Sequence, residues 1–414
     1  MNSFAPVPFL HVYWAFASGY LLSYLLRTVN AVISPELTHD LGLTSSSLGL
    51  LTSAYFVAFG AMQLPAGMLL DRYGPRRVEP VLLLIAGVGT LWFAMAESVS
   101  SLIAARALIG AGVAVCLMAP MKAIAAWYPA ERQASLSGWV MVAGGAGALA
   151  ATAPLEFALR FMNWRSIFVV LSIAAFAIAA WVWWRVPDTA HPATRAGFGA
   201  QWAGVRKVFG APRFWWIAPL GGFGMGSFMA IQGLWSVPWL IEVNGYDRAT
   251  AARHLLALSC VILGGYAFLG LFATQLARRG IHARHLFAAG FALSGAALAA
   301  IVFQLPATYV WWSLYGLGAA VNILAFSILN DGFARELAGR SNTALNLLMF
   351  IGSFLTQWGV GVIIDAVRGA PGNSSAGGLE IAFAIVLALH WLTYAWFVFG
   401  WRRHAHPPAD RIGA

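Results

Sequence analysis

The stretch that decides the fold is Gly67-Met68-Leu69-Leu70-Asp71-Arg72-Tyr73-Gly74-Pro75-Arg76-Arg77. It is a charged turn between two apolar runs, because residues 48–70 and residues 81–96 contain no charged side chain. Each run is long enough for a helix that crosses a lipid bilayer. A turn with three arginines and one aspartate cannot lie in hydrocarbon, so it marks one face of a membrane.

The composition of the whole chain agrees with this interpretation. The 414 residues are 60% hydrophobic and only 10% charged, whereas about a quarter of the residues of a soluble domain are charged. The chain is therefore an integral membrane protein. Its net charge of +10 falls in short loops beside the apolar runs, where it sets topology, and we expect no nucleic-acid partner.

Other classes of function lack their sequence signals. Cys116 and Cys260 both lie within apolar runs, so we expect them to be small hydrophobic residues and not a disulfide or metal pair. We find no Gly-x-x-x-x-Gly-Lys-Ser/Thr loop for ATP and no catalytic triad. We therefore expect no metal, no cofactor and no enzymatic activity.

Apolar runs between charged interruptions predict an all-α integral membrane fold with twelve transmembrane helices. The expected spans are 11–33, 48–70, 78–97, 101–124, 134–158, 164–185, 214–241, 252–276, 284–304, 307–330, 341–366 and 379–401. A long polar segment rich in Pro, Thr and Gly follows the sixth span. We therefore predict a six-helix bundle over 1–186, a cytoplasmic linker over 187–213, a second six-helix bundle over 214–403 and a cytoplasmic tail over 404–414.

The distribution of basic residues predicts the orientation. With the N-terminus inside, most of the 25 lysines and arginines lie in cytoplasmic loops and tails, and few lie in the opposite loops. Positive charge is enriched on the cytoplasmic side of membrane proteins, so both termini are expected in the cytoplasm.

The two halves resemble each other. Residues 106–114 (RALIGAGVA) align with residues 312–320 (WSLYGLGAA), and the charged turn has a weaker counterpart from Gly270 to Gly280. Both similarities fall at corresponding spans. They indicate two pseudo-symmetric bundles made by internal duplication.

Three groups of motifs resemble a known family. The spacing Gly-x-x-x-Asp-Arg-x-Gly-x-Arg-Arg in the charged turn is similar to the signature loop of the major facilitator superfamily, and Arg106 with Gly110 resembles its Arg-x-x-x-Gly motif. Residues 30–35, 41–44, 50–56, 125–132 and Asn163-Trp164-Arg165 resemble the organic-anion symporter branch. The resemblance implies transport by rocking of two bundles around a substrate site near the midplane.

The first expected helix carries a polar stripe. Tyr20, Tyr24 and Arg27 lie at helical spacing on one face, and Asn30 continues it. Such a stripe in an apolar span is expected to line an aqueous cavity, where the planar guanidinium suits a carboxylate or phosphate. The alternative is that Arg27 has a structural ion-pair partner or extends towards the membrane surface.

Arg106, Glu156 and Lys122 are further charged residues in or near the spans of the first half. Arg106 and Glu156 are expected at similar depth, as a structural ion pair or as a pair that couples transport to protons. Lys122, near the inner end of its span, is expected to be an interfacial anchor or part of an inner anion path.

The second half offers uncharged polar residues. Gln232 and Trp235 share a face of the seventh expected helix, Gln357 lies on the eleventh, and Asn322 stands in the middle of the tenth. These side chains either join helices or donate hydrogen bonds to a substrate.

These features together predict a secondary transporter in a bacterial inner membrane, a monomer that moves a small organic anion, either coupled to protons or driven by the anion's own gradient. Efflux of drug-like or amphipathic compounds by proton antiport is the alternative within transport. A non-transporting receptor or assembly factor on the same fold is the alternative outside it. The resemblance assigns gating to Gly67, Asp71, Arg72, Gly74, Arg76, Arg77 and Arg340, with Asp71 capping the inner end of the eleventh helix near Arg340 in the outward-open state.

We predict that Asp71→Asn inserts into the membrane normally but transports more slowly, because the neutral amide caps a helix terminus more weakly than a carboxylate does. Expression in the membrane fraction and initial transport rates measure the two effects. A wild-type rate in this variant would refute the gating role.

Overall fold

The computed structural model describes residues 9–128, 130–187, 203, 206–331, 333, 335–369 and 374–404. Within these ranges the chain is helical almost throughout, and nine helical segments are long and apolar enough to cross a membrane. Each of the twelve expected spans coincides with one helix or with consecutive helices, so the all-α prediction is confirmed. Most of the expected linker and nearly all of the expected tail lie outside the described residues.

The helices of the first half run from the N-terminus to Arg185. They are α1 (Phe9–Leu41), α2 (Ser45–Tyr73), α3 (Pro75–Met95), α4 (Val99–Gly112), α5 (Met118–Trp127), α6 (Ala130–Ala150), α7 (Ala153–Ala158) and α8 (Trp164–Arg185). The second half contains α10 (Pro212–Ala218), η1 (Pro219–Gly224), α11 (Met225–Ala230), η2 (Ile231–Trp235), α12 (Ser236–Pro238), η3 (Trp239–Val243), α13 (Arg248–Arg278), α14 (Ala283–Val302), α15 (Thr308–Ala320), α16 (Ile323–Asn330), α17 (Arg335–Arg368) and α18 (Ser375–His404).

Several expected spans are interrupted. The fourth breaks between α4 and α5, and the tenth breaks between α15 and α16. The fifth span breaks between α6 and α7 because of Pro154. In a continuous helix the backbone amide of residue 154 would donate to the carbonyl oxygen of Ala150, but proline has no amide hydrogen and its ring clashes with that carbonyl. The seventh alternates between α and π geometry from α10 to η3. Non-helical backbone at such depth is tolerated where it is buried in protein.

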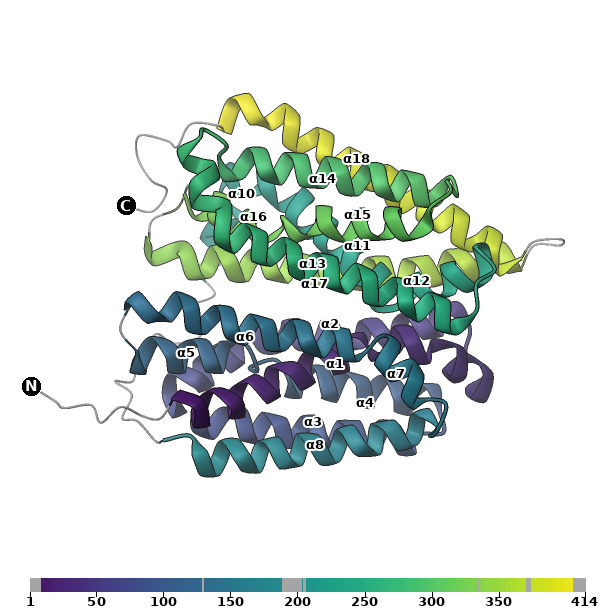
Figure 1. Ribbon diagram of the computed structural model, residues 1–414, viewed down its shortest axis with the longest axis horizontal. Coiled ribbons are helices and arrows are strands. Elements are labelled where there is room, and N and C mark those ends of the chain that lie inside the picture. The colour runs from purple at the N-terminus through teal and green to yellow at the C-terminus, as the bar shows by residue number, and fades with distance from the viewer. Residues whose placement is uncertain are drawn as a thin grey trace, which may run out of the picture. The chain divides into compact units, whose positions relative to one another are not determined.

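Contacts divide the chain into two compact units, one comprising Met1–Leu43 with Ala54–Phe198 and the other Thr44–Ser53 with Gly199–Ala414. In the first unit α3 packs along α8, and α1 packs along α6 (Figure 1). In the second, α14 packs beside α15 and α17 beside α18. Each unit has its own apolar core, around Phe16, Leu70 and Leu82 in the first and around Phe214 and Phe291 in the second.

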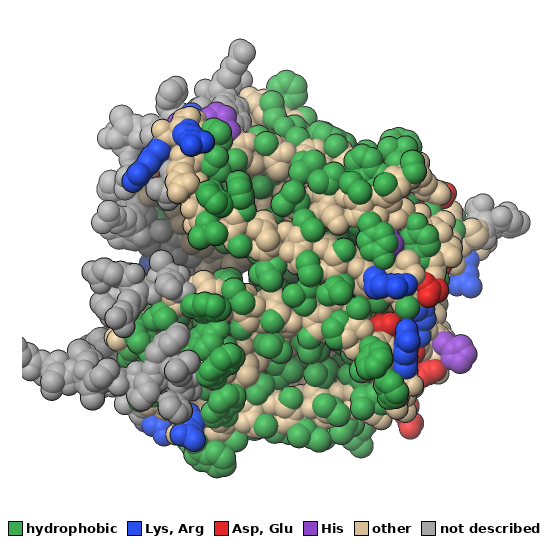
Figure 2. Space-filling model, viewed as in Figure 1, with side chains coloured by type: hydrophobic (Ala, Val, Ile, Leu, Met, Phe, Trp, Pro, Cys, Tyr) green, Lys and Arg blue, Asp and Glu red, His purple; other side chains and the backbone are tan. Residues whose placement is uncertain are grey.

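The visible surface of each unit has the distribution of side chains that a bilayer requires. Hydrophobic side chains cover the middle of the face shown in Figure 2, and the coloured charged groups gather towards the helix ends. The most exposed large apolar side chains of the described residues include Trp184, Leu271 and Phe399. Apolar surface of this extent is stable next to lipid and not next to water.

The first turns of α2 belong to the second unit, where an acidic residue caps them. The Asp365 carboxylate accepts hydrogen bonds from the backbone amides of Ser45 at 3.0 Å and Ser46 at 2.8 Å. These amides have no partner within their own helix, and the positive end of the helix dipole favours an anion there.

The sequence Asn163-Trp164-Arg165 joins three helix ends in the first unit. Asn163 caps α8 by accepting from the Ser166 amide at 2.8 Å, and Arg165 donates to the carbonyl oxygens of Ala94 and Ala96 at the C-terminal end of α3, both at 2.8 Å. The Arg165 guanidinium also lies over the ring of Trp164. This motif therefore fixes where α8 starts relative to the end of α3.

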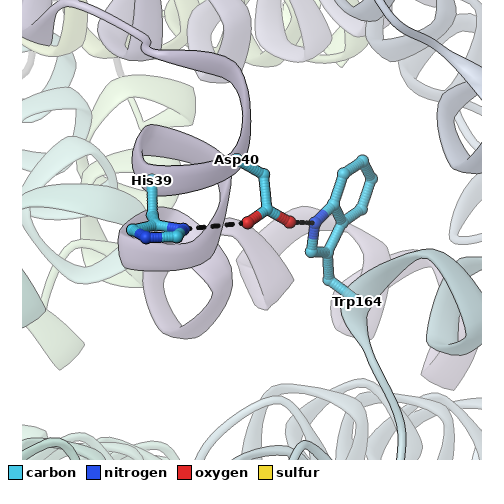
Figure 3. Close-up of polar contacts among 3 residues, drawn as sticks. All are labelled: His39, Asp40 and Trp164. Atoms are coloured by element: carbon cyan, nitrogen blue, oxygen red, sulfur yellow. Dashed lines mark hydrogen bonds and ion pairs between the residues drawn. The ribbon is translucent and has the colours of Figure 1, made fainter.

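The same motif holds the last turn of α1. The buried indole of Trp164 donates to Asp40 Oδ2 at 2.9 Å, and His39 Nδ1 lies 3.1 Å from Asp40 Oδ1, as Figure 3 shows. Hydrogen bonds from His39 and Trp164 lower the pKa of the Asp40 carboxyl from its ordinary value. The ionised form of Asp40 is thus the one that the folded protein favours.

We predict that the stability supplied by Asp40 depends on pH. A carboxyl whose pKa is lower in the folded state stabilises the fold above its unfolded pKa, about 3.9 for Asp, and loses that effect as the pH falls through the folded value. The melting-temperature difference between wild type and Asp40→Asn should therefore be constant above about pH 5 and shrink below about pH 4. Glu97→Gln, which alters an exposed acid, is the control. A difference that does not change with pH would contradict the assignment.

Candidate functional site

The stripe on α1 forms an aromatic wall around an arginine. The rings of Tyr20 and Tyr24 meet edge to face at 5.1 Å. The guanidinium carbon of Arg27 lies 4.5 Å from the ring centre of Tyr24 and 5.1 Å from that of Phe59 on α2. Arg27 Nε is buried and has no hydrogen-bond partner among the described residues. Arg27 is thus held by π faces, and its Nε–H stays available.

A second arginine lies next to the first. Arg106 on α4 is fully buried, and its guanidinium carbon lies 4.9 Å from the ring centre of Tyr55. Arg106 Nη2 donates to the carbonyl oxygen of Arg27 at 3.3 Å, while its Nε and Nη1 are buried without a partner in the described structure. The hydroxyl of Tyr55 donates to the carbonyl oxygen of Ser23 at 3.3 Å.

The close approach of α4 to α2 depends on Gly110. A Cβ atom at this position would collide with the backbone carbonyl of Tyr55. The Arg-x-x-x-Gly spacing therefore places the arginine one turn from the helix crossing, over the ring of the same Tyr55. No other residue type permits this contact without moving the helices apart.

The predicted pairing of Arg106 with Glu156 is absent from this structure. Arg106 contacts the Arg27 carbonyl and the Tyr55 ring instead, and Glu156 lies half-buried on the short helix α7. The helix break before Pro154 separates α7 from α6, so Glu156 does not continue the helix that the sequence predicted. The proton-coupling role of the two residues stays a prediction.

The site in the first unit therefore carries excess positive charge. Neither Arg27 nor Arg106 forms an ion pair with any acidic side chain that the structure describes. Buried charges are stable only when they are paired, hydrogen-bonded or in contact with water, so an anion would lower the free energy of this arrangement. Asn30, which continues the stripe, is completely buried.

The second unit brings two of its four predicted residues together. Trp235 Nε1 donates to the backbone oxygen of Gln357 at 3.1 Å, and both side-chain polar atoms of Gln357 are buried without a partner in the described ranges. Gln232 instead donates to Ser259 on α13 at 3.4 Å. This contact joins two helices, as one of the two alternatives for these amides predicted.

Asn322 lies apart from the Trp235 and Gln357 contact. It occupies the break between α15 and α16, and its Nδ2 lies 3.7 Å from the sulfur of Met349 on α17. Its Oδ1 is buried and has no partner that the structure describes. Asn322 therefore places an unused acceptor inside the second unit.

The charged turn is folded around Gly74 and Asp71. Gly74 has a φ of 76°, a left-handed conformation that favours glycine, and Pro75 then begins α3. Asp71 Oδ1 accepts from Lys122 Nζ at 2.5 Å, and Lys122 also donates to the Leu70 carbonyl at 2.7 Å. Lys122, predicted to be an interfacial anchor or part of an inner anion path, thus has a partner in the charged turn that the sequence did not predict, and the two predicted roles stay predictions.

The other predicted gate residues take varied positions. Arg76 Nε donates to the carbonyl oxygen of Trp183 at the end of α8 at 3.2 Å, and Arg72 lies over the neighbouring Tyr73 ring. Arg77 is exposed, Arg340 is half-buried on α17, and a Cβ at Gly67 would meet open space. Contacts of Arg76 and Asp71 thus tie the turn to α8 and α5.

Sequence reasoning missed Tyr55, Phe59 and the partner of Lys122. The two aromatic residues lie in an uncharged run, where an aromatic side chain is ordinary, and only the structure shows that they face Arg106 and Arg27. The opposite charges of Asp71 and Lys122 gave a signal, but the pair spans two helices that are far apart in sequence. No group of three or more His, Cys, Asp or Glu side chains among the described residues could hold a metal ion.

Comparisons with known proteins agree with this architecture. The model of the Major Facilitator Superfamily matches residues 16–357. The probable sulfoacetate transporter SauU of Cupriavidus necator is 27% identical over 263 residues, which cover 59% of this chain and 60% of that protein. The hexuronate transporter of Escherichia coli K12 is 26% identical over 272 residues, which cover 60% and 62%. The chain thus spans about three fifths of the length of these two relatives.

A solved structure shares the fold. A bacterial homologue of the human lysosomal transporter Spinster, in an inward-facing and occupied conformation, superposes with a TM-score of 0.79 over 97% of this chain and 98% of that one, at 19% identity. At this identity the likeness concerns the fold alone. With a family match over most of its length and this twelve-span architecture, the chain belongs to the Major Facilitator Superfamily, whose members are multi-pass membrane transporters and not enzymes.

Proposed function

We propose that the protein is a secondary transporter of a small organic anion. The observation that carries the proposal is a pair of arginines, half-buried Arg27 and fully buried Arg106, which have unused N–H donors and no acidic partner in the described part of the chain. A carboxylate or sulfonate bound here would accept the unused hydrogen bonds and balance the charge. The names of the relatives, a probable sulfoacetate transporter and a hexuronate transporter, support the same class of substrate.

The aromatic residues define how the anion would bind. Tyr24 and Phe59 hold the Arg27 guanidinium by its faces, and Tyr55 does the same for Arg106. Contact through the faces leaves the N–H groups in the guanidinium plane for the ligand, and their planar fork matches two oxygen atoms of one acid group. Tyr20 completes the wall beside Tyr24, so the apolar part of a small anion would have rings to pack against.

The second unit contains unused polar atoms of its own, which could bind a polar ligand. Gln357 has a free amide nitrogen and a free amide oxygen, Asn322 has a free oxygen, and all three atoms are buried. Unused polar atoms in a protein interior favour a polar ligand or water. Trp235 fixes the backbone at Gln357 and thereby the position of its side chain.

The transport cycle that we propose is alternating access, in which the six-helix bundles 1–186 and 214–403 rock around the bound anion. The charged turn, with Asp71 held by Lys122, would change partners between the two states. We propose a monomer in a bacterial inner membrane with both termini in the cytoplasm, as the distribution of basic residues favours. Symport with protons would drive uptake.

We predict that Arg27→Ala lowers the affinity for the anion by tenfold or more, because a charge-assisted hydrogen bond contributes about 1.5–3 kcal/mol. The affinity is measured from the concentration dependence of the exchange of labelled carboxylates and sulfonates in liposomes. Arg160→Ala, which removes an exposed arginine of the first unit, should behave as wild type. The anion site is excluded if Arg27→Ala binds and exchanges the anion like wild type.

The same liposomes distinguish the proposal from efflux. Wild-type protein that exchanges no anion of the panel, together with a deletion strain that becomes sensitive to several unrelated toxic compounds, would favour drug export instead. A strain with unchanged sensitivity and protein that exchanges anions would support uptake.

We predict that Lys122→Gln and Asp71→Asn act on the same step. Each should slow transport, and the double variant should be no slower than the slower single one, because both remove the same contact. The pair is partly exposed, so the loss of stability should stay below about 1 kcal/mol. Arg160→Gln, which alters an exposed arginine outside the charged turn, is the control. Additive effects on the transport rate would show that the contact does not contribute to gating.

A further inference from the structure

A buried acid in the first unit takes no part in the site described above. Glu79 lies one turn into α3, directly after the charged turn, and none of its surface is exposed. Both of its carboxyl oxygens are buried, and neither has a hydrogen-bond partner in the described structure. Glu79 falls within the third expected span, 78–97, close to the charged turn.

The carboxyl of Glu79 fits against the backbone of α1. A Cβ atom at Gly19 would lie 2.6 Å from Glu79 Oε1, so the absence of a side chain at Gly19 makes the space that the carboxyl occupies. Ile178 of α8 closes the same space with a methyl group. Glycine and isoleucine offer the carboxyl neither a charge nor a side-chain hydrogen bond.

The helices α4 and α5 also pack against α3. Cys116 on the turn between them is completely buried, and a thiol offers no positive charge that could balance a carboxylate. The charged side chains of α4 and α5 have other partners: Arg106 contacts the Arg27 carbonyl and the Tyr55 ring, and Lys122 contacts Leu70 and Asp71. Glu79 takes part in none of the ion pairs found among the described residues.

These surroundings determine the protonation state. An ionised carboxylate without a partner in an apolar interior is far less stable than the neutral acid, so the acid retains its proton in this conformation. Arg27 and Arg106 differ from Glu79 in that they can stay charged. Aromatic rings lie against both guanidinium groups, and a backbone carbonyl accepts a hydrogen bond from Arg106, so these contacts stabilise positive charge. The first unit thus holds an anion site and, separately, a closed proton site.

We propose that Glu79 is the group that binds and releases the transported proton. In this conformation the proton is covalently bound to a carboxyl oxygen, and contact with water in another conformation would ionise the acid to a carboxylate and a free proton. No electron transfer or other reactant is needed. The role in coupling rests on the proposed function, because it requires that the protein transports an anion together with protons.

Two structural features would let the site open. The α4–α5 turn beside Glu79 is not helical, so it can shift without breaking a continuous helix. The contact at Gly19 has no side chain, so a small movement of α1 would admit water to the carboxyl. The charged turn that precedes α3 lies within two helical turns of Glu79, which places the site near the membrane face to which the proton would leave.

Transport in liposomes tests the coupling. Glu79→Gln keeps the shape of the neutral acid but cannot release a proton. We expect this variant to exchange labelled anion against unlabelled anion at equal pH as wild type does, and to lose the accumulation that a pH gradient drives. Glu97→Gln, an exposed acid that follows the same helix, should keep both activities. Gradient-driven accumulation by Glu79→Gln at the wild-type level would overturn the proposal.

Infrared spectroscopy tests the proton itself and needs no substrate. Purified wild-type protein at neutral pH should show the carbonyl band of a protonated carboxylic acid, which Glu79→Gln should lack. If Glu79→Gln does not insert, a shift of the band in Glu79→Asp identifies the residue instead. A wild-type spectrum without the band would overturn the proposal. Wild-type protein that shows the band but exchanges no anion would refute the proposed function and the coupling, and leave Glu79 as a proton site only.

Discussion

The first unit depends on how two positive charges are kept within a bundle of apolar helices. Arg27 and Arg106 have no acidic partner among the described residues, and aromatic rings with one backbone carbonyl take that place. Such contacts are weaker than an ion pair, so the arrangement stays open to an external anion. If a glutamate or aspartate faced either arginine, that carboxylate would neutralise the charge and accept the free hydrogen bonds, and the helices would need no external anion.

The rest of the first unit holds these charges in position. Gly110 brings α4 against Tyr55 of α2, and this contact sets the distance between the Arg106 guanidinium and the tyrosine ring. At one end, Trp164 and Arg165 fix the ends of α1 and α3 to the start of α8. At the other end, Lys122 and Arg76 tie the charged turn to its neighbours. Specific polar contacts thus lie at the helix ends, and close backbone packing lies between them.

The sequence predicts some of this and not the rest, for physical reasons. The twelve spans follow from hydropathy, because hydrocarbon admits only long apolar helices. The stripe that contains Arg27 follows from helical periodicity along a single helix. Other features depend on how different helices pack, which a single sequence does not show. These are the Lys122–Asp71 contact, the aromatic ring beside Arg106 and the surroundings of Glu79. The pairing of Arg106 with Glu156 was inferred from equal depth alone, which leaves the direction of each side chain undetermined.

The interruptions of the fourth and tenth spans fall at corresponding places in the two similar halves. One begins at the end of the segment 106–114 and the other follows its counterpart 312–320, and Asn322 stands at the second of them. The backbone of both turns forms hydrogen bonds between residues three apart in place of several α-helical ones. A span made of two shorter helices bends more easily at the turn between them than a continuous helix does, so each half of the molecule has one place of common origin where the second helix of the span can tilt against the first.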